Sequence, residues 1–274
     1  MTVEELLVLG KKSCHSDHAK ILLAELLDKN PLELFNYLNM EVEEKIVEKY
    51  TKEIDALNKG IPLQYVIGNV NFLGNTFIIN KNVLIPRFET EELVDYTSKY
   101  AKELFTDLVE IIDLGCGSGV IGLSLSKKIS TKSVDLIDIS EEALEVAKEN
   151  AKRLDVKANF IHSDMWKNIN KKYDIIISNP PYIKTDEEIE DIVKNNEPHI
   201  ALYAGDDGLD CYRKIIKGIK EHSKEKCLIA LEIGFNQAND IIELIEKELD
   251  NVKIEVKKDM SDKERMIFIF KNIE

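Results

Sequence analysis

Residues 109–119, VEIIDLGCGSG, join a short apolar segment to a turn that contains three glycines. The apolar part, residues 109–114, has the length and composition of a buried β-strand, and residues 119–129 have the apolar spacing of a helix. Glycine lets the backbone turn sharply and lets a ligand approach the main chain closely. The segment therefore predicts a strand, a turn and a helix of an α/β domain, with a ligand site at the turn.

The chain after residue 108 continues this alternation. Strands are expected near residues 109–114, 133–138, 158–161, 173–178, 226–232, 252–257 and 265–271, and helices near residues 119–129, 141–153, 208–221 and 236–249. Alternating strands and helices indicate βαβ units and a mainly parallel sheet. Only a short polar segment separates the last two strands, so we expect them to form an antiparallel hairpin at the edge of the sheet.

The first 60 residues carry apolar side chains at helical spacing and no strand pattern. Asn30 is suited to cap a helix that starts at Pro31, because proline is tolerated at the first helical position. Another helix is expected from about Glu41 to Asn58. We expect residues 1–70 to form a small helical domain, which either docks a substrate or serves as a passive cap.

A β-hairpin linker is expected at residues 71–86, with its turn at Gly74-Asn75. The following helix is expected from about Thr90 to Leu104, with Thr90 as its cap and acidic residues in its first turn. Residues 87–274 then form the α/β domain.

The composition is that of an ordinary globular protein without an excess of positive charge. Of the 274 residues, 44% are apolar and 32% are charged, and the net charge of −14 disfavours stable binding to nucleic acid. The four cysteines form no CxxC pair, so neither a disulfide framework nor a metal site is expected. The amino terminus lacks a secretory signal pattern, and no apolar run reaches the roughly 18 residues that would span a membrane. We expect a monomeric cytoplasmic protein.

The glycine turn has the pattern GxGxG and follows an acidic residue, Asp113. It lacks both the GxGxxG fingerprint of dinucleotide folds and the GxxxxGK[ST] phosphate loop. An acid before the turn suits a cationic ligand better than a pyrophosphate. This points to S-adenosylmethionine, whose amine and sulfonium are cationic. A nucleotide fold with another ligand is the alternative interpretation.

Acidic residues also follow the next two predicted strands. Asp138 lies about 20 residues after the glycine turn, where a carboxylate can accept hydrogen bonds from both ribose hydroxyls. Alternatively, Asp138 or Ser140 caps the following helix. After the third strand, Asp164 can accept from an adenine amino group and Met165 can cover the ring, although Met165 can equally belong to the core.

The strand at 173–178 ends in an unusual sequence, Asn179-Pro180-Pro181-Tyr182. Prolines have no N–H for a β ladder and hold the preceding residue extended, so Asn179 is fixed at the carboxyl end of the strand. Its amide oxygen and the Pro180 carbonyl can then accept two hydrogen bonds from one planar NH2 group. Tyr182 can supply a ring face for a flat substrate. The alternative is a tight turn after a core strand.

These features fall at the ends of four successive predicted strands, and together they resemble the Rossmann-like, seven-stranded S-adenosylmethionine-dependent methyltransferases. In that superfamily, NPPY-type motifs accompany methylation of planar nitrogens. Residues 85–91, IPRFETE, look more specifically like the IPRPETE segment of the protein-(glutamine-N5) methyltransferases that modify peptide chain release factors. Residues 64–68, 72–74 and 197–209 are also similar to that family. Phe88 departs from the family pattern, which usually has proline at this position.

The resemblance implies an enzyme that methylates the glutamine of a Gly-Gly-Gln loop in class I release factors, with residues 1–70 docking the substrate. It implies cofactor contacts from Gly115, Cys116, Gly117, Ser118, Gly119, Asp138, Met165 and Asn179, to which Asp164 is added as the predicted adenine contact. It implies that Asn179, Pro180, Pro181 and Tyr182 hold the substrate, with Asn179 and Pro180 acting in catalysis. For Arg87 and Glu89, we favour an interdomain salt bridge over a catalytic role.

Three other functions are compatible with the motifs. An adenine-N6 DNA methyltransferase or a ribosomal RNA guanine methyltransferase would present a similar amino group to Asn179, but the acidic composition counts against both. A non-catalytic partner protein that keeps S-adenosylmethionine for stability is the third. Such a protein has no need for the acceptor pair at Asn179.

Overall fold

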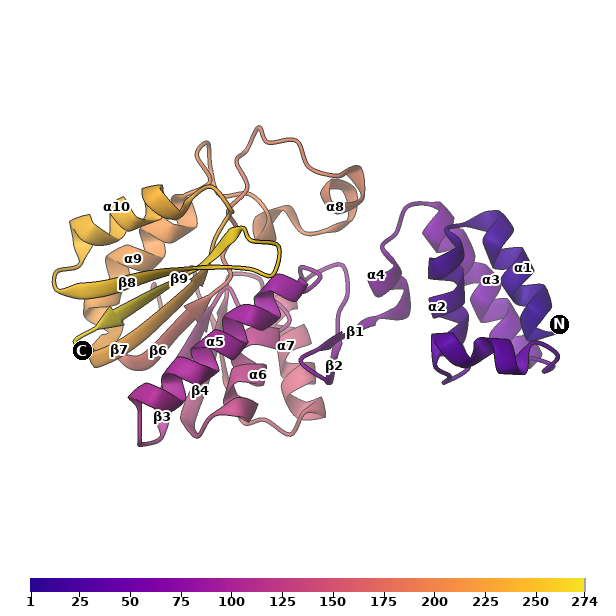
Figure 1. Ribbon diagram of the computed structural model, residues 1–274, viewed down its shortest axis with the longest axis horizontal. Helices are drawn as coiled ribbons and strands as arrows, with labels where there is room; N and C mark the ends of the chain where they lie inside the picture. The colour runs from indigo at the N-terminus through magenta and orange to yellow at the C-terminus, as the bar shows by residue number, and fades with distance from the viewer. Residues whose placement is uncertain (274) are drawn as a thin grey trace. The chain divides into compact units, whose positions relative to one another are not determined.

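The computed structural model describes residues 1–273 and divides into two compact units (Figure 1). The first unit comprises Met1–Asn69 with Glu190–Asn196, and the second comprises Val70–Ile189 with Glu197–Glu274. In the described part of the chain, no helix is both long and apolar enough to cross a membrane.

The first unit is helical, and its elements are α1 (Val3–Ser13), α2 (Ser16–Leu26), the 3-10 helix η1 (Pro31–Tyr37), α3 (Glu44–Asn58), α4 (Leu63–Ile67) and α8 (Asp191–Asn196). Tyr50 of α3 is fully buried at its centre, and its hydroxyl donates to the carbonyls of Leu6 and Ala19. Asn30 caps η1 as predicted, because its side chain accepts from the Leu32 N–H at 2.9 Å. The segment is a 3-10 helix, however, and the third predicted helix begins at Glu44 instead of Glu41.

The two-stranded hairpin consists of β1 (Asn69–Phe72) and β2 (Asn75–Ile78). Its turn is at Leu73-Gly74, one residue before the predicted position, and both residues have positive φ, 48° and 75°. The Asn71 side chain accepts from the Gly74 N–H at 3.1 Å, which holds the turn closed. Phe72 and Phe77 are buried below it with their rings edge to face.

The main sheet has seven strands in the order β5-β4-β3-β6-β7-β9-β8. Their bounds are β3 (Val109–Leu114), β4 (Thr131–Asp138), β5 (Asn159–His162), β6 (Tyr173–Ser178), β7 (Ser223–Glu232), β8 (Val252–Lys258) and β9 (Glu264–Lys271). All neighbours pair in parallel except β9, which is antiparallel to both β7 and β8. The prediction of a closing antiparallel hairpin at the edge is therefore confirmed.

Helices cover both faces of this sheet (Figure 1). α5 (Phe88–Leu104), α6 (Val120–Lys128) and α7 (Glu141–Arg153) pack on one face, while α9 (Asp210–His222) and α10 (Ala238–Glu248) pack on the other. Successive residues of β3 enter the two cores: Ile111 joins the first and Ile112 the second. Strands buried on both faces need a continuous apolar run, which is why 109–114 and 173–178 were recognisable in the sequence.

The order of strands creates a crevice where open α/β sheets bind ligands. The chain places β4 and β5 on one side of β3 and then returns, so that β6 pairs with the other side of β3. At such a switch point the loops after the two central strands separate, which leaves a crevice outside their carboxyl ends. The glycine turn follows β3 and Asn179 follows β6, so both lie at this crevice.

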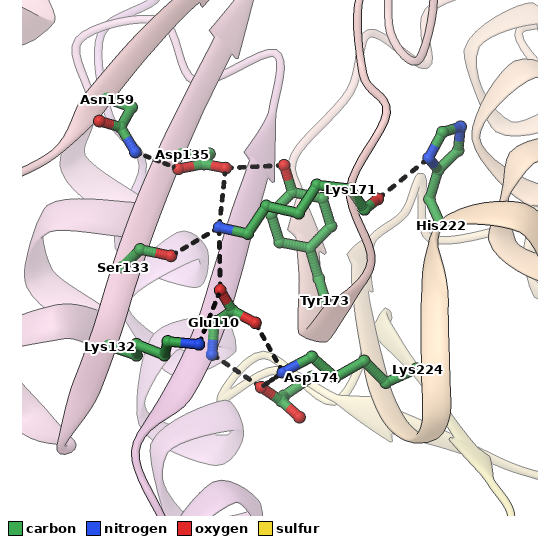
Figure 2. Close-up of polar contacts among 10 residues, drawn as sticks. All are labelled: Glu110, Lys132, Ser133, Asp135, Asn159, Lys171, Tyr173, Asp174, His222 and Lys224. Atoms are coloured by element: carbon green, nitrogen blue, oxygen red, sulfur yellow. Dashed lines mark hydrogen bonds and ion pairs between the residues drawn. The ribbon is translucent and has the colours of Figure 1, made fainter.

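A polar network fastens the opposite, amino ends of the parallel strands (Figure 2). All five parallel strands contribute to it, among others through Glu110 of β3, Asp135 of β4, Asn159 of β5, Tyr173 of β6 and Lys224 of β7. Asp135 accepts from Asn159 at 2.6 Å and from Tyr173 at 2.7 Å. The hydrogen bond from Lys224, together with Lys171, lowers the pKa of Glu110 to about 2. Because these groups are paired with one another, we assign this end of the sheet a structural role.

Candidate active site

A cavity of about 310 Å³ lies at the carboxyl end of the sheet. That volume is in the range of small-molecule sites. The predicted site residues that line it are Gly115, Cys116, Gly117, Ser118, Asp138, Asp164, Met165, Asn179 and Pro181. Residues from four strand ends thus share one cavity, although Gly119, Pro180 and Tyr182 are not among its lining residues.

The glycine turn presents its main chain to the cavity. Gly115 and Gly117 have φ values of 71° and 53°, in the left-handed region that favours glycine. A β-carbon built on either residue would meet no atom within 4 Å, so open space lies over both positions. Gly119 instead starts α6, and a β-carbon there would press on Leu123 at 3.1 Å. Gly115 and Gly117 therefore provide a surface against which a ligand can lie closely.

Asp113 does not contribute to this surface, although its charge was the reason to expect a cationic ligand. The residue is fully buried and is not among those that line the cavity. One carboxyl oxygen accepts from the Gly122 N–H of α6 at 2.9 Å, and within residues 1–273 the other has no hydrogen-bond partner. Burial raises the pKa of Asp113 to about 7. Its role is to connect β3 to α6 beneath the turn.

Asp138 is bound to the glycine turn, while its neighbour Ser140 caps the following helix. Its Oδ2 accepts from the Gly117 N–H at 2.8 Å, and its Oδ1 accepts from the Ser140 N–H at 2.9 Å. Ser140 caps α7 by accepting from the Ala143 N–H. Each Asp138 oxygen has a second lone pair, so the carboxylate can still accept from two adjacent hydroxyls. Burial raises the pKa of Asp138 above its ordinary value.

Asp164 and Met165 form the next part of the wall. The Asp164 carboxylate is held by Lys214 of α9 at 2.9 Å, and both residues line the cavity. Met165 has a positive φ of 48°, and it both lines the cavity and packs against the second core. Trp166 turns away, because its ring stacks on His222 and its N–H donates to the Ile215 carbonyl.

Asn179 is half-buried, and its side chain has a defined direction. The Nδ2 group donates to Thr90 Oγ1 at 3.2 Å. Thr90 lies in the first turn of α5 and is not its cap, because the helix begins at Phe88 with Arg87 as N-cap. The Thr90 hydroxyl donates to the buried Glu232 of β7 at 2.7 Å, which explains why it is not used as a cap.

The residues after Asn179 diverge in their positions. Pro180 is buried, whereas Pro181 lines the cavity. The Tyr182 ring packs against the second core, and its carbonyl accepts from Gln237 at 3.0 Å. Burial raises the pKa of Tyr182 to about 12. The Tyr182 ring was expected to offer a face to the substrate. The structure instead places it in the second core, outside the cavity lining.

Two further segments, which carry none of the predicted site residues, complete the cavity. Asn82, Val83, Leu84, Pro86 and Thr90 come from the linker and α5, and Pro198, Ile200, Ala201, Tyr203, Ala204, Gly205, Asp210, Cys211 and Lys214 come from the chain after residue 197. Buried Asn150 of α7 connects the linker to the glycine turn, since its Nδ2 donates to the carbonyls of Ile78 and Ser118. An asparagine on the apolar face of a predicted helix was the only sequence signal for this connection.

Arg87 forms an ion pair, but not between domains. Its Nη2 lies 2.6 Å from Glu197 Oε1, and Glu197 Oε2 accepts from the Ile85 N–H at 3.1 Å. Both partners belong to the second compact unit, so the expected interdomain bridge is wrong. The pair joins the linker to the segment that begins at Pro198, and both lead into the cavity wall.

The comparisons with known proteins agree over most of the chain. Residues 87–196 match the family model "Methyltransferase small domain", and residues 13–68 match "PrmC N-terminal domain". The chain is 36% identical to the release factor glutamine methyltransferase of Bacillus cereus, over 91% of this chain and 90% of that protein. It is 40% identical to the enzyme of the same name from Streptococcus pneumoniae, over 84% of this chain and 81% of that protein.

A solved structure shows the same fold at much lower identity. The T. thermophilus 16S rRNA N2 G1207 methyltransferase, in complex with AdoMet and guanosine, has a TM-score of 0.53 and 15% identity. The match covers 74% of this chain and 50% of that chain. This likeness establishes the Rossmann-like methyltransferase fold of the sheet unit.

Proposed function

Because this chain belongs to the release factor glutamine methyltransferases, we propose that it methylates the side-chain nitrogen, N5, of the glutamine in a Gly-Gly-Gln motif. The protein is an S-adenosylmethionine-dependent methyltransferase, and its substrate is a release factor glutamine. The observation that carries the choice of atom is the direction of Asn179. Its NH2 group donates to Thr90, so its oxygen is the atom available to a substrate N–H.

The residues around the cavity fit the cofactor. Open space over Gly115 and Gly117 leaves room for it against the main chain, and Asp138 retains acceptor capacity for two ribose hydroxyls. Asp164 and Met165 would hold the adenine just after β5, the third strand of the main sheet in chain order. When bound, S-adenosylmethionine supplies a methyl group on a positively charged sulfur, which is electrophilic.

Asn179 and Pro180 would orient the substrate amide. A carboxamide nitrogen is a poor nucleophile because its lone pair is delocalised into the carbonyl. Asn179 Oδ1 and the Pro180 carbonyl accept its two N–H groups and thereby turn the lone pair toward the methyl donor. Pro180 lies between two residues that line the cavity, Asn179 and Pro181, although its own ring is buried. Orientation of this kind can supply several kcal/mol, and fixed acceptors add electrostatic stabilisation.

Three further parts of the proposal concern the whole protein. We propose that the helical unit docks the release factor, that the enzyme acts as a monomer, and that it works in the cytoplasm where translation factors are found. The net charge of −14 supports a protein substrate over a nucleic acid, whose phosphates attract clustered Lys and Arg. The likeness to a ribosomal RNA enzyme is one of fold and does not favour that rival.

Methyl transfer from labelled cofactor to a purified class I release factor tests the proposal. Duplex DNA and ribosomal RNA are offered in parallel, and mass spectrometry locates the methyl group. We expect label on the glutamine of the Gly-Gly-Gln motif and none on either nucleic acid. Label on adenine or guanine, or on another residue of the release factor, would refute the proposal.

A further inference from the structure

A buried chain of hydrogen bonds leads from Asn179 away from the cavity. Asn179 Nδ2 donates to Thr90 Oγ1 at 3.2 Å, and Thr90 Oγ1 donates to Glu232 Oε2 at 2.7 Å. The exposed fractions of Thr90 and Glu232 are 2% and 1%. Thr90 borders the cavity, whereas Glu232 is not among its lining residues. Glu232 therefore influences the site through Thr90 and Asn179 and does not touch a ligand.

The chemistry of the three groups fixes the direction of this chain. An ionised carboxylate can only accept, so the single hydroxyl proton of Thr90 is directed to Glu232. The Thr90 oxygen then has only lone pairs left for Asn179. The amide must present its NH2 group to Thr90, because a flipped amide would place two acceptor oxygens against each other. The Asn179 side chain also acts to lower the pKa of Glu232, which favours the ionised carboxylate that this direction requires.

We propose that Glu232 and Thr90 are positioning residues that hold the Asn179 carboxamide with its oxygen toward the substrate, and that ionisation of Glu232 enforces this orientation. The inference deepens the proposed function and rests on it, since it concerns the acceptor that orients the glutamine nitrogen. Nothing in the NPPY sequence itself selects one of the two amide orientations. The selection comes from α5 and β7, which are distant in sequence from the motif.

The charged and titratable groups around Glu232 set where this ionisation occurs. They are Glu89 of α5, Tyr182 after β6, Tyr212 of α9 and Arg265 of β9. Burial raises the pKa of Glu232 to about 7, while the bond from Thr90 and the charge of Arg265 oppose that rise. Protonated Glu232 becomes a donor as well as an acceptor. The hydrogen bonds from Asn179 through Thr90 to Glu232 can then reverse their direction. Correct orientation of Asn179 is therefore favoured as pH rises through about 7.

Glu232→Gln is the first test. Glutamine keeps the shape of the side chain but carries a permanent donor, which permits the reversed direction of the hydrogen bonds through Thr90. With the full-length enzyme and a release factor, we expect kcat to fall by about 10-fold to 100-fold, with little change in KM for the release factor. The wild-type kcat should rise with pH between about 6 and 8, and the variant profile should be flat. Calorimetric affinity for S-adenosylmethionine should be unchanged, because Glu232 does not line the cavity.

A matched pair at Thr90 separates positioning from packing. Thr90→Ser keeps the hydroxyl and should retain most of the turnover, whereas Thr90→Val keeps the shape and should lose it. Equal turnover in the two variants would overturn the proposal. So would a wild-type kcat that is flat across pH 7, or wild-type turnover in Glu232→Gln.

A measurement independent of methyl transfer keeps this inference separate from the proposed function. The side-chain 15N–1H signals of Asn179, assigned by their loss in Asn179→Asp, should shift with an apparent pKa of about 7 in the wild type and remain fixed in Glu232→Gln. Signals that do not respond to Glu232 overturn the inference even if release factor is methylated. If no glutamine is methylated, the proposed function fails, and the titration still decides whether Glu232 orients the amide.

Discussion

Asp138 Oδ2 accepts a hydrogen bond from the Gly117 N–H at 2.8 Å, so the carboxylate after β4 is attached to the glycine turn after β3. This contact joins two strand ends into one part of the cavity wall. It also leaves each Asp138 oxygen with capacity for a ribose hydroxyl.

Replacing Asp138 with Ala should weaken binding of S-adenosylmethionine by about 1–3 kcal/mol, the range for hydrogen bonds to charged groups. Isothermal calorimetry measures this directly. Asp250→Ala is the matched control, because Asp250 is 85% exposed and does not line the cavity. Unchanged affinity in the Asp138 variant would place the ribose elsewhere.

Asp113 should make stability fall as pH rises. Its pKa is raised from 3.8 to about 7 by burial, so the folded state holds a proton that the unfolded state releases. The stabilising contribution is complete below about pH 4 and is lost as pH rises through about 7. A difference of about three pKa units corresponds to about 4 kcal/mol at most.

Denaturant unfolding at about pH 5 and pH 8 compares the wild type with Asp113→Asn, which cannot ionise. We expect the free energy of unfolding to fall less in the variant between these values. Glu232, whose pKa is also raised to about 7 by burial, makes a contribution of the same sign that remains in both proteins. If the free energy of unfolding changes equally with pH in the wild type and in Asp113→Asn, Asp113 does not titrate in this range.

Apolar residues on η1 should serve the proposed docking of release factor. Leu32 and Phe35 are 79% and 65% exposed, and they lie three residues apart on the same short helix. The double variant Leu32→Ser, Phe35→Ser should raise KM for the whole release factor by about 10-fold, the effect of removing one or two anchor residues. Turnover of a short Gly-Gly-Gln peptide should be unchanged. If the double variant has the wild-type KM for release factor and the wild-type turnover of the peptide, η1 is not part of the docking surface.

Periodicity predicted the parts of the fold in which burial determines residue type. Strands β3 and β6 were placed at their observed ends, because both faces of each are buried and the sequence is apolar throughout. The short separation between β8 and β9 likewise forced a hairpin. Periodicity could not locate residues 198–205, which line the cavity without forming a long helix or strand.

Errors arose where a polar side chain has a distant partner. Thr90 has the chemistry of a helix cap, but its hydroxyl is used by Glu232, 142 residues away. Asp113 precedes the glycine turn, but its carboxyl faces α6 beneath it. Local sequence shows what a side chain can do, and only the tertiary structure shows which partner it has. Residues of all four strand-end motifs share one cavity because a parallel sheet brings its carboxyl ends together whatever their local partners are.

The sharpest test of the proposed site is Asn179 itself. Asn179→Ala removes the acceptor for the substrate N–H and should lower single-turnover methylation of release factor by about 10²–10³-fold, the usual effect of losing one preorganised polar group. Asn179→Asp keeps an acceptor but has no NH2 for Thr90, and it adds a carboxylate beside buried Glu232. We expect its rate to fall as well, because like charges and the lost donor disturb the alignment.

Asn251→Asp is the control for a residue that only makes a turn. Asn251 is exposed and has a φ of 54°, a conformation that asparagine and aspartate both adopt readily, so its substitution should leave the rate unchanged. If Asn179 were only a turn residue, Asn179→Asp would behave in the same way. Circular dichroism and cofactor calorimetry establish that each variant is folded before rates are compared. Near-normal rates in both Asn179 variants would remove the residue from the mechanism, and with it the main reason to place an amide nitrogen at the end of β6.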